Sequence, residues 1–265
     1  MPMRQPRRPI LVTGGTGTLG RVLVQQLLDN GLRPRVLSRR AQNSSDPAGV
    51  QWVTADLLKG PKVADAVADV DAIVHCATNG RHPADDVNGT RRLIDTALLG
   101  GSPHLIYVSI VGVDKIPLKY YRYKLGIEGI VERSGLPWSV LRATQFHDLV
   151  VQLLRGAGRL PVMTLPAGVS GQPIDTADVA HRLLDIVAAP PQGRAPDIGG
   201  PRIETVQDLA QQYLRAAGKK RKLASIWTPG AVAHGYRDGL HLTPEHADGT
   251  VTFQDHLDRT IRIKR

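Results

Sequence analysis

Tyr120 and Lys124 are the residues whose types and spacing point most directly to chemistry. Two residues four positions apart stand on one face of a helix, so a phenol and an ammonium would point to one place. A phenol with its ordinary pKa of about 10 transfers protons poorly at neutral pH, and a nearby cation lowers that pKa toward the working range. Ser109 ends an apolar strand-like run eleven residues earlier, where its hydroxyl would hold a substrate oxygen. The set predicts proton transfer, although such spacing also occurs among surface residues.

A glycine-rich loop lies between an apolar run at residues 10–13 and an amphipathic segment at 21–28. Glycines here let the backbone turn sharply and approach a pyrophosphate with no Cβ in the way. The first N–H groups of a helix lack intrahelical partners, and the helix dipole favours an anion beside them. We therefore predict dinucleotide binding rather than a purely structural turn. The loop residues assigned to it are Gly14, Thr16, Gly17, Thr18, Leu19 and Gly20.

Arg39 and Arg40 follow the second predicted strand, at residues 35–38. A protein that prefers NAD usually carries an acidic residue at this place, whereas arginine accommodates the 2′-phosphate of NADP. A guanidinium also holds phosphate oxygens in a forked geometry. The alternative is a pair of solvated arginines. With the glycine loop upstream, the sequence predicts NADP(H) in preference to NAD(H), and leaves open which arginine is the main contact.

Two further strand ends carry candidate cofactor contacts. Asp56 and Leu57 follow the strand predicted at 51–54, where the carboxylate would bond the adenine amine or cap the turn into the next helix. Ala77 and Thr78 follow the strand at 72–76 and are small enough to let the chain pass close to a flat ligand. Cys76 is interpreted as a buried, inert thiol, because nothing near it in sequence would lower its pKa.

The first half of the chain alternates strand-like and helix-like segments. Buried apolar strands alternating with helices predict an α/β fold with a Rossmann-type, doubly wound parallel sheet. Such a sheet binds its ligand at the carboxyl ends of its strands. The remaining predicted strands are 105–110 and 139–142, and the predicted helices are 63–70, 85–99, 120–133, 179–187 and 205–217.

The domain organisation is expected to follow this change in pattern. We predict a basic tail at 1–8, a Rossmann domain at 9–145, and a small C-terminal substrate-binding portion at 146–265, partly interleaved with the sheet. Residues 227–265 receive no assignment from their pattern. Several histidines gather there, but without compact ligand spacing such as H-E-x-x-H they are interpreted as structural or pocket-lining, and no metal is predicted.

Composition sets limits on partners and location. The formal net charge of +10 is concentrated at both chain ends and at residues 219–222, without the interleaved aromatic residues of a stacking platform. We therefore expect no nucleic-acid binding. A single cysteine fits a reducing compartment, and no apolar run is long enough for a signal peptide core or a membrane span. The expected location is the cytoplasm, with no membrane partner.

The motifs together resemble the short-chain dehydrogenase/reductase superfamily, and more narrowly its atypical, extended members with NmrA-like NAD(P)H-binding domains. The glycine loop matches the cofactor motif, Asp56-Leu57 the adenine position, and Ser109, Tyr120 and Lys124 the catalytic residues. The narrower resemblance rests on segments 86–94, 107–113 and 141–148, and it covers roughly residues 9–215. One departure is Asp86, which stands where the superfamily frequently has asparagine.

The resemblance implies roles for residues that spacing alone does not assign. It implies that Lys124 also bonds the nicotinamide ribose and that Ala143 and Thr144 lie beside the nicotinamide. It implies that Gln145, Phe146 and His147 begin the substrate pocket, with a structural role as the alternative for His147. Related proteins often dimerise through the tyrosine helix, so the protein is expected to be a monomer or a homodimer.

The sequence thus predicts an NADPH-dependent oxidoreductase that transfers a hydride to a small carbonyl or to a quinone-like or imine-like acceptor. Tyr120 would donate the proton, Lys124 would lower its pKa, and Ser109 would orient the acceptor oxygen. The alternatives are a non-catalytic, NmrA-like module that senses NADP(H), and an epimerase or dehydratase that retains its NAD(P).

Overall fold

The computed structural model describes residues 8–60, 62–80 and 82–261. It divides the chain into two compact units. Unit 1 is the chain up to Ser109 together with Arg122–Leu141 and Ala180–Pro196, and unit 2 is Ile110–Tyr121, Arg142–Val179 and the residues from Asp197 onward. The predicted basic tail at 1–8 lies outside the described residues except for Arg8, whose N–H donates to Asp71 Oδ2 at 2.8 Å.

Unit 1 is built on a seven-stranded sheet in the order β3-β2-β1-β4-β5-β6-β9. Neighbouring strands run parallel, as the pairing of Val12 with Val36 on one side and Val74 on the other illustrates. This confirms the predicted Rossmann-type fold. The strands are β1 (Ile10–Thr13), β2 (Pro34–Ser38), β3 (Gln51–Thr54), β4 (Ala72–His75), β5 (His104–Ile110), β6 (Trp138–Ala143) and β9 (Gly193–Arg194).

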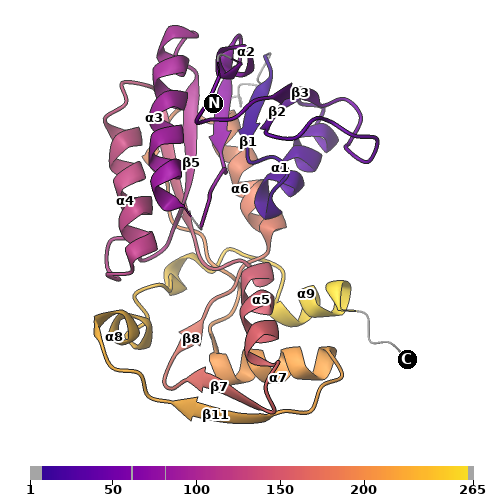
Figure 1. Cartoon of the computed structure of the whole chain (residues 1–265), viewed down its shortest axis with the longest axis vertical. Helices are drawn as coiled ribbons and strands as arrows, with labels where there is room; N and C mark the ends of the chain where they lie inside the picture. Colours follow the sequence, from indigo (N-terminus) through magenta and orange to yellow (C-terminus); the bar gives the residue numbers. More distant parts are fainter. Residues whose placement is uncertain (1–7, 61, 81, 262–265) are drawn as a thin grey trace. The chain divides into compact units, whose positions relative to one another are not determined.

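Helices cover both faces of this sheet (Figure 1). One face packs a core against α2, α3 and α4 that includes Leu11, Ile73, Leu93 and Ile127, all essentially inaccessible to solvent. Two-sided burial explains why the central strands are continuous apolar runs rather than alternating ones. The helices of unit 1 are α1 (Thr18–Asp29), α2 (Val63–Val67), α3 (Pro83–Leu99), most of α4 (Lys119–Glu132) and most of α6 (Thr176–Ala188).

Unit 2 contains elements that the sequence pattern missed. The clearest is α5 (His147–Ala157), which packs with α7 on a core containing Leu154, Met163 and Tyr213. The described part of residues 227–265, a segment that received no assignment, contains two further α-helices. The other elements are β7 (Val162–Pro166), β8 (Ser170–Gly171), β10 (Glu204–Thr205), α7 (Val206–Ala216), β11 (Lys222–Ile226), α8 (Ala231–Arg237), the 3-10 helix η1 (Pro244–His246) and α9 (Phe253–Thr260).

The helix predicted at 63–70 is too long, since α2 ends at Val67. Ala68 is extended and Asp69 has a φ of 53°, a left-handed conformation that aspartate tolerates better than most residues. No helix among the described residues is long and apolar enough to cross a bilayer.

Candidate functional site

The glycine loop has a geometry that side chains would block. Gly14 has a φ of 68°, and a Cβ there would lie 2.7 Å from the Ala77 nitrogen. A Cβ on Gly20 would lie 2.2 Å from the Gly14 carbonyl oxygen, which also accepts the Gly17 N–H at 2.8 Å. The loop is therefore folded tightly against the start of α1 and the end of β4.

The apex of this loop is open to solvent. Thr16, Gly17 and Thr18 are exposed, while Leu19 is buried beneath them. Gly17 is the N-cap of α1 and supplies no side-chain hydrogen bond, and the first turn of the helix carries no acidic residue. The free N–H groups and the positive end of the helix dipole are thus available to an anionic ligand.

The two arginines after β2 differ in their surroundings. Arg40 is held by Asp46 through a two-nitrogen ion pair and lies 4.7 Å over the ring of Trp52. The hydrogen bond to Asp46 raises the pKa of Arg40. Arg39 is exposed, and its guanidinium makes no hydrogen bond or ion pair within the described part of the chain. Arg39 is consequently the arginine that is available to a ligand phosphate.

Asp56 and the Ala77-Thr78 segment both form local turns. Asp56 Oδ1 accepts the Leu58 N–H at 3.0 Å, which fits the turn-capping alternative while leaving Oδ2 available. The Ala77 N–H donates to Thr13 Oγ1 at 3.3 Å, and Thr78 Oγ1 donates to Asp86 Oδ2 at 2.9 Å. Asp86 therefore holds the chain that follows β4.

A buried histidine that sequence reasoning missed connects these elements. His75 Nδ1 lies 2.6 Å from Thr13 Oγ1, and its Nε2 lies 2.9 Å from Thr90 Oγ1. Thr90 donates its own proton to the Asp86 carbonyl, so His75 Nε2 is the donor and Nδ1 the acceptor. Burial lowers the pKa of His75 to about 3, and the neutral ring ties β1 to β4 and α3. Its place at the end of a predicted strand was the only sequence signal.

Lys124 and Ser109 lie close together in unit 1. Lys124 Nζ donates to the Val108 carbonyl at 2.8 Å and lies 4.3 Å over the ring of Tyr107. Burial lowers the pKa of Lys124 to about 8, although the charge of Asp86 opposes this. Ser109 is buried, and its Oγ has no hydrogen-bond partner within residues 8–60, 62–80 and 82–261. An ammonium has three protons and Nζ has this one acceptor among the described residues, so both groups retain unused hydrogen-bonding capacity.

Tyr120 is half-buried and stands one turn before Lys124 on α4, as its spacing predicts. The neighbouring Tyr121 is engaged elsewhere, since its hydroxyl lies 3.1 Å from that of Tyr236 in unit 2. Burial raises the pKa of Tyr121 far above its ordinary value. Cys76 is half-buried rather than fully buried, and burial raises the pKa of its thiol to about 12, in agreement with an inert thiol.

The segment after β6 belongs to unit 2 and is mostly fixed by backbone contacts. Ala143 is buried, and Thr144 Oγ1 donates to the Gln172 carbonyl at 2.6 Å. Phe146 is the N-cap of α5. The Gln145 amide lies beside the Tyr121 hydroxyl, but its buried Nε2 makes no hydrogen bond of good geometry to the residues that the structure describes. Gln145 therefore has an unused donor.

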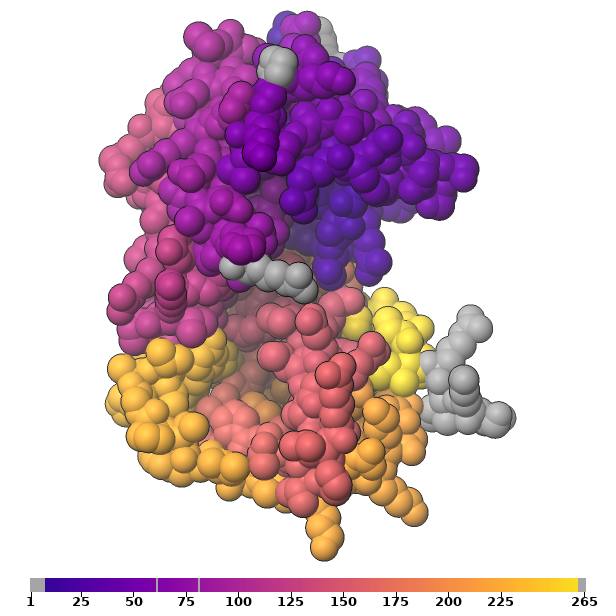
Figure 2. All heavy atoms as spheres, in the orientation of Figure 1, coloured from indigo at the N-terminus to yellow at the C-terminus, as the bar shows by residue number. Residues whose placement is uncertain are grey.

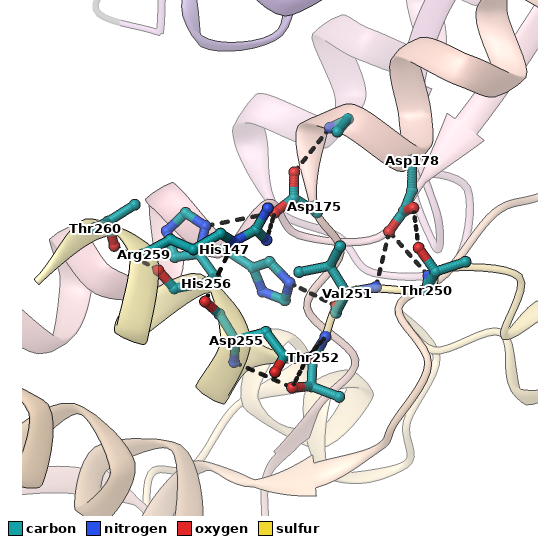
Figure 3. Close-up of polar contacts among 11 residues, drawn as sticks. His147, Asp175, Asp178, Thr250, Val251, Thr252, Asp255, His256, Arg259 and Thr260 are labelled. Atoms are coloured by element: carbon teal, nitrogen blue, oxygen red, sulfur yellow. Dashed lines mark hydrogen bonds and ion pairs between the residues drawn. The ribbon is translucent and has the colours of Figure 1, made fainter.

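His147 lies in a buried cluster that Figure 3 shows around α9. Its Nε2 donates to the Val251 carbonyl at 3.1 Å, and its ring lies 5.0 Å from that of His256. His256 Nδ1 lies 3.6 Å from Asp175 Oδ2, which also accepts Arg259 Nη2 at 2.8 Å. These contacts favour the structural interpretation of His147. Among the described residues, no three histidine, cysteine or acidic side chains could hold a metal ion.

Asp175→Asn is expected to destabilise the protein by about 2 kcal/mol at neutral pH. Burial alone raises the pKa of Asp175, but bonds from His256 and the Ala177 N–H and the charge of Arg259 lower it to about 2. A depressed carboxyl pKa stabilises the fold above the unfolded-state value and loses that effect as pH falls through about 4 to 2. Denaturant titrations at several pH values measure the difference between wild type and variant, which should shrink over that range. Asp258→Asn, at an exposed position of α9, is the control.

His241 is a second residue without a sequence signal for its position. Its ring packs 4.6 Å from that of Tyr236, and its Nε2 donates to the Ser170 carbonyl at 2.9 Å. The buried Nδ1 is left as an acceptor without a partner in the described part of the chain. Unit 2 thus contains an unpaired donor on Gln145 and an unpaired acceptor on His241, both next to the hydrogen-bonded pair Tyr121 and Tyr236.

Comparison with known proteins decides the family. A family model described as NAD(P)H-binding matches residues 14–190, which is more than half of the chain. The chain belongs to this NAD(P)H-binding family. The matched range includes the glycine loop, Ser109, Tyr120 and Lys124. Solved structures similar to this chain include a member of the short-chain dehydrogenase/reductase superfamily.

Individual relatives of this NAD(P)H-binding protein carry different names. The photosystem II assembly factor Ycf39 of Trieres chinensis is 26% identical over 230 residues, which are 82% of this chain and 72% of that protein. A (4-alkanoyl-5-oxo-2,5-dihydrofuran-3-yl)methyl phosphate reductase of Streptomyces griseus is 27% identical over 84% of this chain and 78% of its own. The NADPH-dependent quinone oxidoreductase QOR2 of Escherichia coli superposes with a TM-score of 0.77 at 18% identity, over 96% of this chain and all of that one. At that identity the superposition shows the fold alone.

Proposed function

We propose that this NAD(P)H-binding protein is an NADPH-dependent reductase that acts on a small carbonyl or on a quinone-like or imine-like acceptor. The observation that carries the proposal is the state of Lys124 and Ser109. Within the described part of the chain, Lys124 is a buried ammonium with unused donors, and next to it on β5 is a buried serine hydroxyl without a partner. Buried polar groups are nearly always hydrogen-bonded, and a bound ligand would provide the partners that these two groups lack. The name of the Streptomyces reductase supports the same reaction class.

The residues that would hold the cofactor fit its chemistry. The loop from Gly14 to Gly20 has exposed N–H groups for a pyrophosphate, and it has no space for a Cβ at Gly14 or Gly20. Arg39 would bind the 2′-phosphate, Asp56 the adenine, and Lys124 the nicotinamide ribose. Ala77, Thr78, Ala143 and Thr144 are proposed to line the flat part of the cofactor. Arg40 instead stabilises its own loop by its contacts with Asp46 and Trp52.

Arg39→Gln is expected to weaken NADPH binding by about tenfold to a hundredfold, the effect of losing a charge-assisted bond to phosphate. NADH has no 2′-phosphate, so its affinity should change little. Fluorescence titration with both cofactors measures the two dissociation constants. Arg40→Gln is the comparison variant, and an equal loss of NADPH affinity in it would contradict the assignment to Arg39.

Bound NADPH would supply a hydride to the acceptor. In the proposed reaction with a carbonyl or quinone-like acceptor, Ser109 Oγ donates a hydrogen bond to the acceptor oxygen, and the Tyr120 hydroxyl gives that oxygen its proton. The Lys124 ammonium, one turn along α4, stabilises the phenolate that remains. Gln145 Nε2 and Phe146 contact the rest of the acceptor, while His147 supports α5.

Steady NADPH oxidation, followed by absorbance against a panel of aldehydes, ketones, quinones and cyclic imines, tests the proposal. Turnover with at least one class supports it. Binding of NADPH without turnover on any class would favour a second candidate, a redox-sensing module, which the assembly-factor name of one relative brings forward. A sensor must bind NADPH and NADP⁺ with different affinities, because a ligand pair without differential binding cannot switch a protein. Product formation without net NADPH consumption would indicate an epimerase or dehydratase.

A further inference from the structure

The sheet of β7 and β11 in unit 2 has one covered face and one open face. The strands pair in parallel, with Val162 opposite Lys222 and Pro166 opposite Ile226. Met163 and Leu165 point into the core against α5 and α7, so Val162 and the other alternate residues of β7 point outward. Leu223, opposite Met163, packs on the same core, which turns Lys222 and Ile226 outward as well.

Large apolar side chains are exposed on and beside this open face. Leu160, just before β7, is 62% exposed, and Trp227, just after β11, is 66% exposed. Val162 and Ile226 lie between them on the outward rows, at 42% and 49%. We call these four residues the apolar face. Isolated exposed apolar residues are ordinary, but a group on one sheet indicates an interaction surface.

A run of cations borders the apolar face. Lys219, Lys220, Arg221 and Lys222, which we call the basic rim, lead directly into β11. Arg221 Nε donates to the Gly158 carbonyl at 3.2 Å, which brings the rim to the segment that leads into β7. Because the strands are parallel, Arg159 enters at the same end. Figure 2 shows side chains of the orange segment, which includes the rim, projecting from the surface of unit 2.

Acidic residues are absent from the segments that build this surface. Residues 149–174 contain two arginines, residues 209–237 contain six lysines or arginines, and neither segment contains an aspartate or glutamate. None of these cations pairs with a carboxylate in the part of the chain that the structure describes. At the far end of β11, the Arg237 guanidinium lies 3.8 Å over the Trp227 ring. The cations of this surface are therefore not neutralised by direct ion pairs among the described residues.

We propose that the basic rim and the apolar face together bind the surface of an anionic phospholipid bilayer. Lipid phosphates would meet the rim, and the four apolar side chains would enter the boundary between head groups and acyl chains, where tryptophan is favoured. A polynucleotide fits less well, since it would leave the aliphatic side chains exposed and find one aromatic ring for stacking. The sequence predicts no membrane partner because no segment can span a bilayer. Lying on a bilayer surface requires no span.

The test is co-sedimentation of the full chain with vesicles. Phosphatidylcholine vesicles are compared with vesicles in which about a third of the lipid is phosphatidylglycerol. We expect binding to the anionic vesicles only, weakening as salt is added. The triple variant Lys219→Gln, Lys220→Gln, Lys222→Gln should bind at least about tenfold less. The matched control replaces three exposed cations of unit 1 (Arg33→Gln, Lys62→Gln, Arg91→Gln) and should bind as the wild type does.

A second variant separates a bilayer from other polyanions. Ile226→Ser with Trp227→Ser keeps every charge, and it should reduce vesicle binding while leaving retention on heparin unchanged. Circular dichroism and NADPH titration of each variant verify that the fold is intact. The proposal is overturned if the wild type binds neither vesicle, or if the serine variant binds anionic vesicles as tightly as the wild type does. Equal loss in the unit 1 control would show a net-charge effect and would also overturn it.

Discussion

Tyr120→Phe is expected to reduce turnover by about two to four orders of magnitude, the usual contribution of a positioned general acid. The change removes one hydroxyl and keeps the ring, so α4 and the packing around Tyr120 should persist. Because the phenol is assigned to the acceptor rather than to the cofactor, the dissociation constant for NADPH should stay near the wild-type value. Initial rates of NADPH oxidation, with any acceptor found by screening, measure the effect.

Tyr123→Phe is the matched control for this experiment. Tyr123 is on the same helix and is partly exposed, but it lacks the four-residue spacing to Lys124. It should retain nearly full turnover. Full turnover in the Tyr120 variant on a ketone would disprove the proton-donor role. Turnover retained only on quinones would show that these acceptors take their proton from elsewhere.

Lys124→Met is expected to reduce turnover by about a hundredfold or more, because the phenol loses the cation that stabilises its conjugate base. The pKa of about 8 also predicts the pH dependence of the wild type. Lys124 is charged below this pH and neutral above it, so turnover should fall as pH rises through about 8. In Lys124→Arg the charge persists, and that fall should move to higher pH. An unchanged midpoint in the arginine variant would assign the titration to another group.

The pH dependence of the free energy of unfolding gives an independent test of the lowered pKa of Lys124. Burial penalises the charged form, so the unfolded chain holds this proton more tightly than the folded protein does between about pH 8 and 10.4. The free energy of unfolding contributed by Lys124 should therefore rise across that window, by at most about 3 kcal/mol. The rise is read as the difference between wild type and Lys124→Met in denaturant titrations, since other groups titrate equally in both. Binding of NADPH plays no part in this measurement.

Local sequence determined the Rossmann-type sheet and the position of its ligand loop. Apolar runs alternating with helical periods specify buried parallel strands, and the glycines between residues 14 and 20 specify a loop that no other residue could form. The one-turn spacing of Tyr120 and Lys124 is likewise a property of one helix. Each of these signals lies within a short segment, which explains why it can be predicted without a structure.

The tertiary structure decided what depends on residues far apart in the chain. It distinguished Arg39 from Arg40, because Asp46 and Trp52 hold only the second. It also brought His75 between Thr13 and Thr90, and left donors or acceptors unused on Ser109, Gln145 and His241. Hydrogen bonds of this kind follow from the packing of separate elements, and they leave no periodic pattern of residue types in the sequence.

Contacts between distant segments also explain why cations and apolar side chains lie together on the surface of unit 2. In the sequence, residues 219–222 are one of several basic clusters, and Leu160 and Trp227 are unremarkable apolar positions. Only the parallel pairing of β7 with β11 places cations and apolar side chains on one surface. The sequence by itself therefore determined the fold and the place of the glycine-rich loop, since both are encoded locally. The partners of the proposed catalytic groups and the composition of the outer surface were decided by long-range pairing, which only the folded chain contains.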